Sequence, residues 1–230
     1  MASIAIPKAG LMVVDMQEDF CEPSGALAVK GGRELAPIIN ELLARPGFVV
    51  KVASRDFHPR GHISFASSHA GAEAFKSSHT IKNPENEAET QTTLLWPDHC
   101  VQGTSGCELI PELHANKLTY VVDKGTDNRA ESYSAFGPPF RNPKYGTTGL
   151  EKYLRDAGVT HLFVVGLAFD FCVRSTALDA AELGFNTFVI QEATNSVMRW
   201  EEARASTGKE FAEKGVKLIT LDSEELKMVN

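Results

Sequence analysis

A cysteine stands where an apolar stretch gives way to a helical pattern, and this arrangement suits nucleophilic chemistry. Residues 162–165 have the composition of a buried strand, a turn follows at Gly166, and the helical spacing of apolar residues begins at Cys172. A thiol at a helix N-terminus lies close to unpaired backbone N–H groups, which favour the thiolate and can donate to an oxyanion. A buried structural cysteine is the commoner role of a free thiol. The segment alone therefore favours a nucleophile only slightly.

Three other apolar runs also end in side chains that can do chemistry. Asp15 ends the first run, Asp56 and His58 follow the second, and Lys124 follows the third. Ligands of open α/β sheets bind beyond the carboxyl ends of the strands, so we expect these groups to lie near Cys172. Catalysis by a thiol needs a proton acceptor and a cation beside it, which Asp15 and Lys124 can supply. Each residue alone is more simply a helix cap or a surface charge, but the set favours catalysis.

Asp56, His58 and His99 form a candidate metal site. Two ring nitrogens and one carboxylate, with coordination positions left open, suit a catalytic or substrate-binding divalent metal. Zn²⁺ is the first choice, and Fe²⁺ or Mn²⁺ is also compatible. A fourth position is left open to Ser64, His62, His69 or water.

Apolar runs alternate with helical patterns along the chain, which predicts a doubly wound α/β fold. The predicted strands are 11–14, 49–53, 118–122, 162–165, 187–190 and 216–220, and the predicted helices are 34–43, 150–157, 172–183 and 200–214. Near-continuous apolar strands separated by helices indicate a mostly parallel six-stranded sheet with helices on both faces. We expect one domain over residues 1–230, with a polar, site-building insertion around 57–102 that carries short helices.

Composition excludes several classes of function. Thirty acidic and 23 basic residues give a net charge of −7, so nucleic acid and anionic membranes are poor partners. No apolar window reaches transmembrane length. Four cysteines without paired spacing favour a reduced, intracellular and most simply cytoplasmic protein. Glycine-rich nucleotide motifs and a G-x-S-x-G elbow are absent from the sequence. The oligomeric state is left open, with a homo-oligomer compatible.

Five segments, in order along the chain, resemble the motifs of the isochorismatase-like cysteine hydrolases. They are the opening motif at 13–20, the two metal segments at 55–65 and 95–101, the lysine motif at 124–125 and the cysteine motif at 166–173. The two metal segments are similar to those of the nicotinamidase branch of this family. Phe57 and Phe171 stand where family members often have Trp and Tyr. Both keep an aromatic ring, so these departures bear on fine specificity rather than on the chemistry.

The resemblance implies hydrolysis of nicotinamide to nicotinic acid and ammonia, a step of NAD salvage, through a thioester on Cys172. Pyrazinamide is implied as a second substrate. Asp15 would act as base and then as acid, and Lys124 would hold it ionised and favour the thiolate. The N–H groups of Ala168 and Cys172 would form the oxyanion hole, with a cis peptide bond between Leu167 and Ala168. The metal would bind the pyridine nitrogen.

Phe20, Trp96 and Phe171 would contact the substrate ring, with core packing as the alternative role of each. Two other functions stay open. The first is another carboxamide hydrolase, such as one acting on a carbamoyl group, although the metal segments argue against it. The second is a non-catalytic metal- or ligand-binding α/β protein, which would not need Asp15, Lys124 and Cys172 together. Isochorismate hydrolysis is disfavoured because that branch lacks the cysteine.

Overall fold

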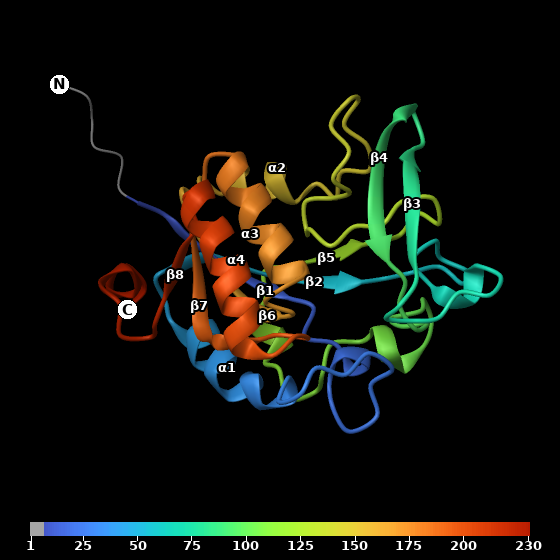
Figure 1. The fold of residues 1–230 in the computed structure, drawn as a ribbon. Helices are drawn as coiled ribbons and strands as arrows, with labels where there is room; N and C mark the ends of the chain where they lie inside the picture. Colours follow the sequence, from blue (N-terminus) through green and yellow to red (C-terminus); the bar gives the residue numbers. More distant parts are fainter. Residues whose placement is uncertain (1–6) are drawn as a thin grey trace.

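The computed structural model describes residues 7–230, and its centre is a six-stranded parallel sheet (Figure 1). The strands are β1 (Ala9–Val14), β2 (Phe48–Asp56), β5 (Tyr120–Lys124), β6 (His161–Leu167), β7 (Asn186–Asn195) and β8 (Lys217–Ile219). Their order across the sheet is β5-β2-β1-β6-β7-β8. All six predicted strands are therefore confirmed, and so is the doubly wound arrangement.

Within residues 7–230, four α-helices cover the two faces of this sheet. They are α1 (Ala36–Ala44), α2 (Leu150–Asp156), α3 (Cys172–Glu182) and α4 (Trp200–Lys214). Figure 1 shows α1 on one face and the other three helices on the opposite face. β1 is buried on both sides: Leu11 and Val13 belong to the core that includes Ile39 of α1, whereas Met12 and Val14 belong to the core under α2, α3 and α4. This double burial explains why β1 is a continuous apolar run.

The strand order brings four carboxyl ends together at one edge. β1 pairs with β2 on one side and with β6 on the other, and β2 pairs with β5. The chain thus reverses its direction of winding beside β1, which is where doubly wound folds bind ligands. Within residues 7–230, no helix combines the length and the apolar character needed to cross a membrane.

The insertion contains a hairpin that the sequence did not predict. A single 3-10 turn, Ala66–Ser68, represents the expected short helices, and β3 (Ser78–Asn83) pairs antiparallel with β4 (Asn86–Leu94). In Figure 1 this hairpin stands to one side of the main sheet. Only one residue of β4 is buried, and the strand is rich in Thr and Glu, so it lacks an apolar run. The turn at Asn83-Pro84 was the available signal.

Candidate active site

Cys172 is the first residue of α3, directly beyond the end of β6, and is 6% exposed. The peptide bond between Leu167 and Ala168 is cis, as the resemblance implied. The N–H groups of Ala168 and Cys172 are free to donate to a ligand, because neither donates to a main-chain acceptor within the described residues. Ala168 and Cys172 also line one pocket at the carboxyl edge of the sheet.

Lys124 is the buried cation of the site. It ends β5 and is 1% exposed, yet its Nζ atom lies 2.9 Å from Oδ2 of Asp15 and 3.4 Å from Sγ of Cys172. The same ammonium group donates to the carbonyl oxygen of Ser132 at 3.1 Å and contacts the carboxylate of Asp56. The structure thus brings together the three residues that the sequence proposed for thiol chemistry.

Asp15 follows β1 with a left-handed backbone (φ 47°) and is fully buried. The hydroxyl of Ser54 donates to its Oδ1 atom at 2.6 Å. Burial raises the pKa of Asp15, while Lys124 and the Ser54 hydroxyl oppose the rise. A raised carboxyl pKa suits a group that must both take up and release a proton.

Opposing effects act on the pKa of Cys172. Burial raises the pKa of the thiol well above its usual value, and the nearby charge of Lys124 only opposes this. Burial also disfavours the charged form of Lys124, but Asp15 and Asp56 raise its pKa well above the usual value. Desolvation by burial therefore favours the neutral thiol, whereas the ammonium group of Lys124 favours the thiolate.

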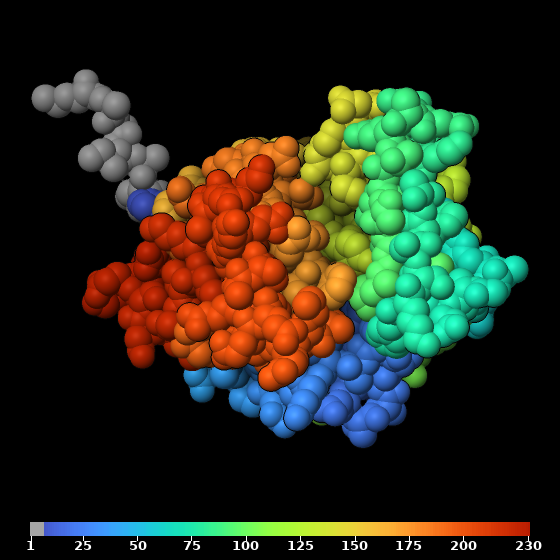
Figure 2. Space-filling model, in the orientation of Figure 1, coloured from blue at the N-terminus to red at the C-terminus, as the bar shows by residue number. Residues whose placement is uncertain are grey.

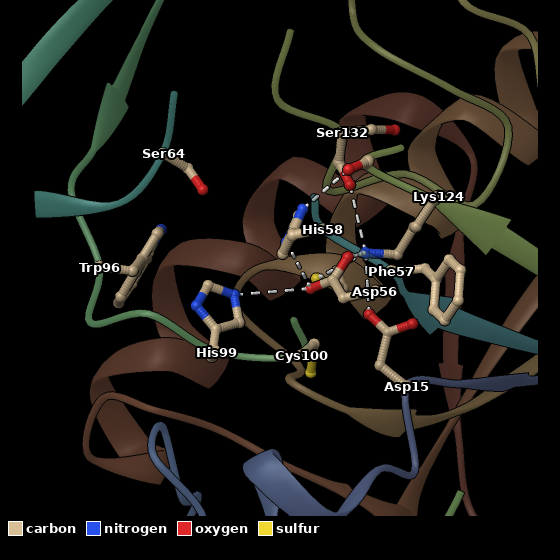
Figure 3. A network of polar contacts seen from close by, with 12 residues as sticks. Asp15, Asp56, Phe57, His58, Ser64, Trp96, His99, Cys100, Lys124 and Ser132 are labelled. Atoms are coloured by element: carbon tan, nitrogen blue, oxygen red, sulfur yellow. Dashed lines mark hydrogen bonds and ion pairs between the residues drawn. The ribbon is translucent and has the colours of Figure 1, made fainter. Parts of the chain in front are cut away.

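Asp56, His58 and His99 converge as a candidate metal centre (Figure 3). Oδ2 of Asp56 lies 3.7 Å from Nε2 of His58 and 3.8 Å from Nε2 of His99. Each ring donates its Nδ1–H to a carbonyl oxygen, that of Gly125 at 2.9 Å for His58 and that of Pro97 at 2.7 Å for His99. Both Nε2 atoms are thereby left as acceptors. The buried Nε2 of His58 has no hydrogen-bond partner among the described residues, so this donor set fits a divalent cation.

Gly125 makes room for His58. Its φ is +63°, and a Cβ atom there would lie 2.4 Å from Cε1 of the His58 ring. Glycine therefore allows both the left-handed turn after β5 and the close approach of the ring.

The open fourth position is not filled by His62 or His69 in the described chain. Both ring nitrogens of His62 are engaged, with Ser64 Oγ at 2.8 Å and the carbonyl of Ala130 at 3.2 Å. His69 instead packs against His79, with ring centroids 4.3 Å apart. A buried carboxylate that the sequence analysis missed, Glu131, groups with His58 and His62. Nothing in the local sequence around Glu131 signalled it.

The three expected ring contacts lie in one pocket. Phe20, Trp96 and Phe171 line it together with Cys172 and His99. Trp96 and Phe171 meet edge to face, with ring centroids 5.0 Å apart. Phe57 is not part of this wall; its ring lies under the guanidinium of Arg55 at 5.0 Å. Wall residues that the sequence analysis missed are Leu27, Val29, Tyr133 and Val197.

A parallel doubly wound sheet with these side chains at its carboxyl edge defines a domain of the α/β class with the candidate site of a cysteine-dependent hydrolase. Residues 9–223 match the isochorismatase domain, so the chain belongs to the isochorismatase family.

Known members of this family are similar over most of the chain. The nicotinamidase of Acinetobacter baylyi is 38% identical over 203 residues, which are 85% of this chain and 88% of that protein. The structure of the yeast nicotinamidase bound to the inhibitor nicotinaldehyde has a TM-score of 0.86 at 33% identity and covers 92% of this chain and 99% of its own. The structure of the Pyrococcus horikoshii pyrazinamidase in complex with zinc has a TM-score of 0.71 at 32% identity, covering 94% of this chain and 100% of its own.

Proposed function

We propose that this protein is a nicotinamidase that converts nicotinamide and water to nicotinic acid and ammonia and also accepts pyrazinamide. The observation that carries the proposal is the shared pocket: Cys172 and the candidate metal ligands Asp56 and His99 line one aromatic-walled cavity. A flat ring amide can therefore reach the thiol with its carboxamide and the metal site with its ring nitrogen. The nicotinamidases among the relatives support this choice of substrate.

Asp56, His58 and His99 would hold the metal, and zinc is our choice because the donor set is two nitrogens and one carboxylate oxygen. The zinc-bound pyrazinamidase supports the same choice, and Fe²⁺ or Mn²⁺ is compatible with these donors. When bound, the metal supplies a Lewis acid that can hold the pyridine nitrogen. Phe20, Trp96 and Phe171 would then orient the ring by apolar and edge contacts.

Acylation begins when Asp15 takes the proton of Cys172 and the sulfur forms a bond to the carboxamide carbon. The N–H groups of Ala168 and Cys172 donate hydrogen bonds to the carbonyl oxygen and stabilise the negative charge that develops there. Asp15 then returns the proton to the amide nitrogen, the C–N bond breaks, and ammonia leaves an acyl thioester. Lys124, in contact with Asp15 and Sγ, stabilises the negative charge that moves between them.

Deacylation uses the same groups in reverse. Asp15 takes a proton from water, the resulting hydroxide attacks the thioester carbon, and the C–S bond breaks. The proton on Asp15 returns to Cys172, and nicotinic acid is released. One carboxyl group thus serves as base and acid in both half-reactions, which agrees with its raised pKa.

Ammonia release from nicotinamide, pyrazinamide and a carbamoyl amide tests this proposal, with Cys172→Ala as the matched variant. We expect turnover of the two ring amides and its loss in Cys172→Ala, because the thioester cannot form. Activity of the variant within about tenfold of the parent, a barrier change of only about 1.4 kcal/mol, would contradict the nucleophile assignment. Preference for the carbamoyl amide would assign the chain to a different amidase.

A further inference from the structure

Gln17, in the loop that follows β1, is bonded to the backbone of a candidate metal ligand. This side chain is fully buried. Its Oε1 atom accepts the N–H of Asp56 at 2.8 Å, and its Nε2 atom donates to the carbonyl oxygens of Asp56 at 2.7 Å and Cys107 at 2.9 Å. A single amide therefore satisfies both main-chain polar groups of Asp56.

The sheet topology explains why Asp56 needs this partner. β2 pairs with β1 only as far as Val13 and Ala53, and β1 ends at Val14, whereas β2 continues to Asp56. The edge of β2 that faces β1 is thus without a strand neighbour at Asp56. The Gln17 amide takes the place of the missing strand there, so a buried strand end keeps its hydrogen bonds.

Asp19, two residues after Gln17, is bonded to the segment that carries the candidate ligand His99. Its Oδ2 atom accepts the N–H of Cys100 at 2.7 Å, and Cys100 follows His99 with a left-handed backbone (φ 46°). Its Oδ1 atom accepts the N–H of Ala26 at 3.4 Å. Gly106 leaves space for this carboxylate, because a Cβ atom there would lie 2.0 Å from Oδ2.

We propose that Gln17 and Asp19 are positioning residues for the metal site. Asp56 and His99 come from distant parts of the chain, and these two side chains attach both segments to one loop. A metal requires its ligand atoms within a few tenths of an ångström of about 2.0–2.2 Å, so a shift of either backbone segment weakens binding. The same loop carries Asp15, so the metal site and the proton-transfer residue share one support. The inference rests on the proposed function, since it takes Asp56 and His99 as ligands.

Zinc affinity, measured without substrate by competition with a chromogenic chelator, tests the proposal. Gln17→Glu keeps the size of the side chain and its acceptor but loses both donated bonds, and we expect zinc to bind about 10- to 100-fold more weakly. Asp19→Ala loses the acceptor for Cys100 and should weaken binding to a similar extent. Asp19→Asn keeps one acceptor oxygen and should restore most of the affinity.

Asn83→Asp is the matched control. Asn83 is also fully buried, donates two side-chain hydrogen bonds and accepts one, but it lies at the turn of the β3–β4 hairpin. The Asn83→Asp variant should bind zinc with the affinity of the parent protein, even if its melting temperature falls. Parent-like affinity in both Gln17→Glu and Asp19→Ala, or an equal loss in Asn83→Asp, would overturn the positioning role. If Gln17→Glu does not fold, Asp19→Ala against Asp19→Asn decides. A parent protein that binds no zinc would instead refute the metal site itself.

Discussion

The ammonium group of Lys124 contacts the carboxylate of Asp56, and this pair connects the candidate metal site to the thiol of Cys172. The same ammonium lies beside Asp15, so one buried cation faces two buried carboxylates. Burial opposes the charge on Asp56, but the ammonium group of Lys124 favours it, and the pKa of Asp56 lies below its usual value. A second cation beside Asp56 would offset the remaining negative charge, which agrees with the donor set found there.

Because Lys124 touches both Asp15 and Cys172, the three residues should behave as one unit. Asp15→Asn and Lys124→Ala should each lower kcat for nicotinamide by about 10²–10⁴-fold. The kcat of the double variant should be little lower than that of the less active single variant, since residues that act together give non-additive losses. Steady-state kinetics of the four proteins provide the measurement. Losses that multiply would show that the two side chains act independently.

The acid limb of the pH profile should respond to Ser54. Its hydroxyl lowers the pKa of Asp15, so Ser54→Ala should raise that pKa further. Asp15 works as the base only when ionised, and activity is lost as the pH falls through its pKa. The acid limb of kcat/KM should therefore move to higher pH in Ser54→Ala.

Ser132→Ala is the control for this profile. The Ser132 hydroxyl bonds to the carbonyl of Ser134 rather than to Asp15, and only its main-chain oxygen contacts Lys124. The acid limb of kcat/KM in Ser132→Ala should match that of the parent protein. An unmoved or downshifted limb in Ser54→Ala would assign the titration to a group other than Asp15.

Substrate choice should depend on the metal through the ring nitrogen. Benzamide has nearly the shape of nicotinamide but lacks that nitrogen, so it should be a poor substrate of the metal-loaded enzyme. Chelation of the metal, or His99→Ala, should shrink the ratio of kcat/KM for nicotinamide to that for benzamide. Equal proportional losses for both amides would leave the metal without a role in binding the ring.

Tyr133 should control the pocket wall through Trp96. The indole N–H of Trp96 donates to Oη of Tyr133 at 2.9 Å, and this Oη lies 2.7 Å from Oγ1 of Thr93. Tyr133→Phe leaves a buried N–H unpaired, which costs about 1–3 kcal/mol of the free energy of unfolding. We expect a several-fold higher KM for nicotinamide with kcat nearly unchanged. Tyr153→Phe is the control, because the hydroxyl of Tyr153 donates to the carbonyl oxygen of Thr119, away from the pocket. This variant should leave KM unaltered. A similar change of KM in Tyr153→Phe would remove the link between Trp96 and Tyr133.

The elements that carry the chemistry could be predicted from the sequence because their signals are local. Burial on both faces makes β1 and β6 continuous apolar runs, and helical periodicity places Cys172 at the start of α3. Parallel strands then bring Asp15 and Lys124 to the same edge as Cys172. The residue types and their order along the strands were enough to bring together Asp15, Asp56, Lys124 and Cys172, whereas His99 lies in a loop and was recognised through the family's second metal segment.

Contacts between distant segments were decided only by the tertiary structure. The β3–β4 hairpin has little apolar patterning, and Tyr133 reaches the pocket wall from a loop with no local signal. The bond from Gln17 to Asp56 depends on β2 extending beyond β1, which is a property of strand pairing. The raised pKa of Cys172 depends on how completely the fold removes water from the thiol, because desolvation acts through three-dimensional burial rather than through position in the chain.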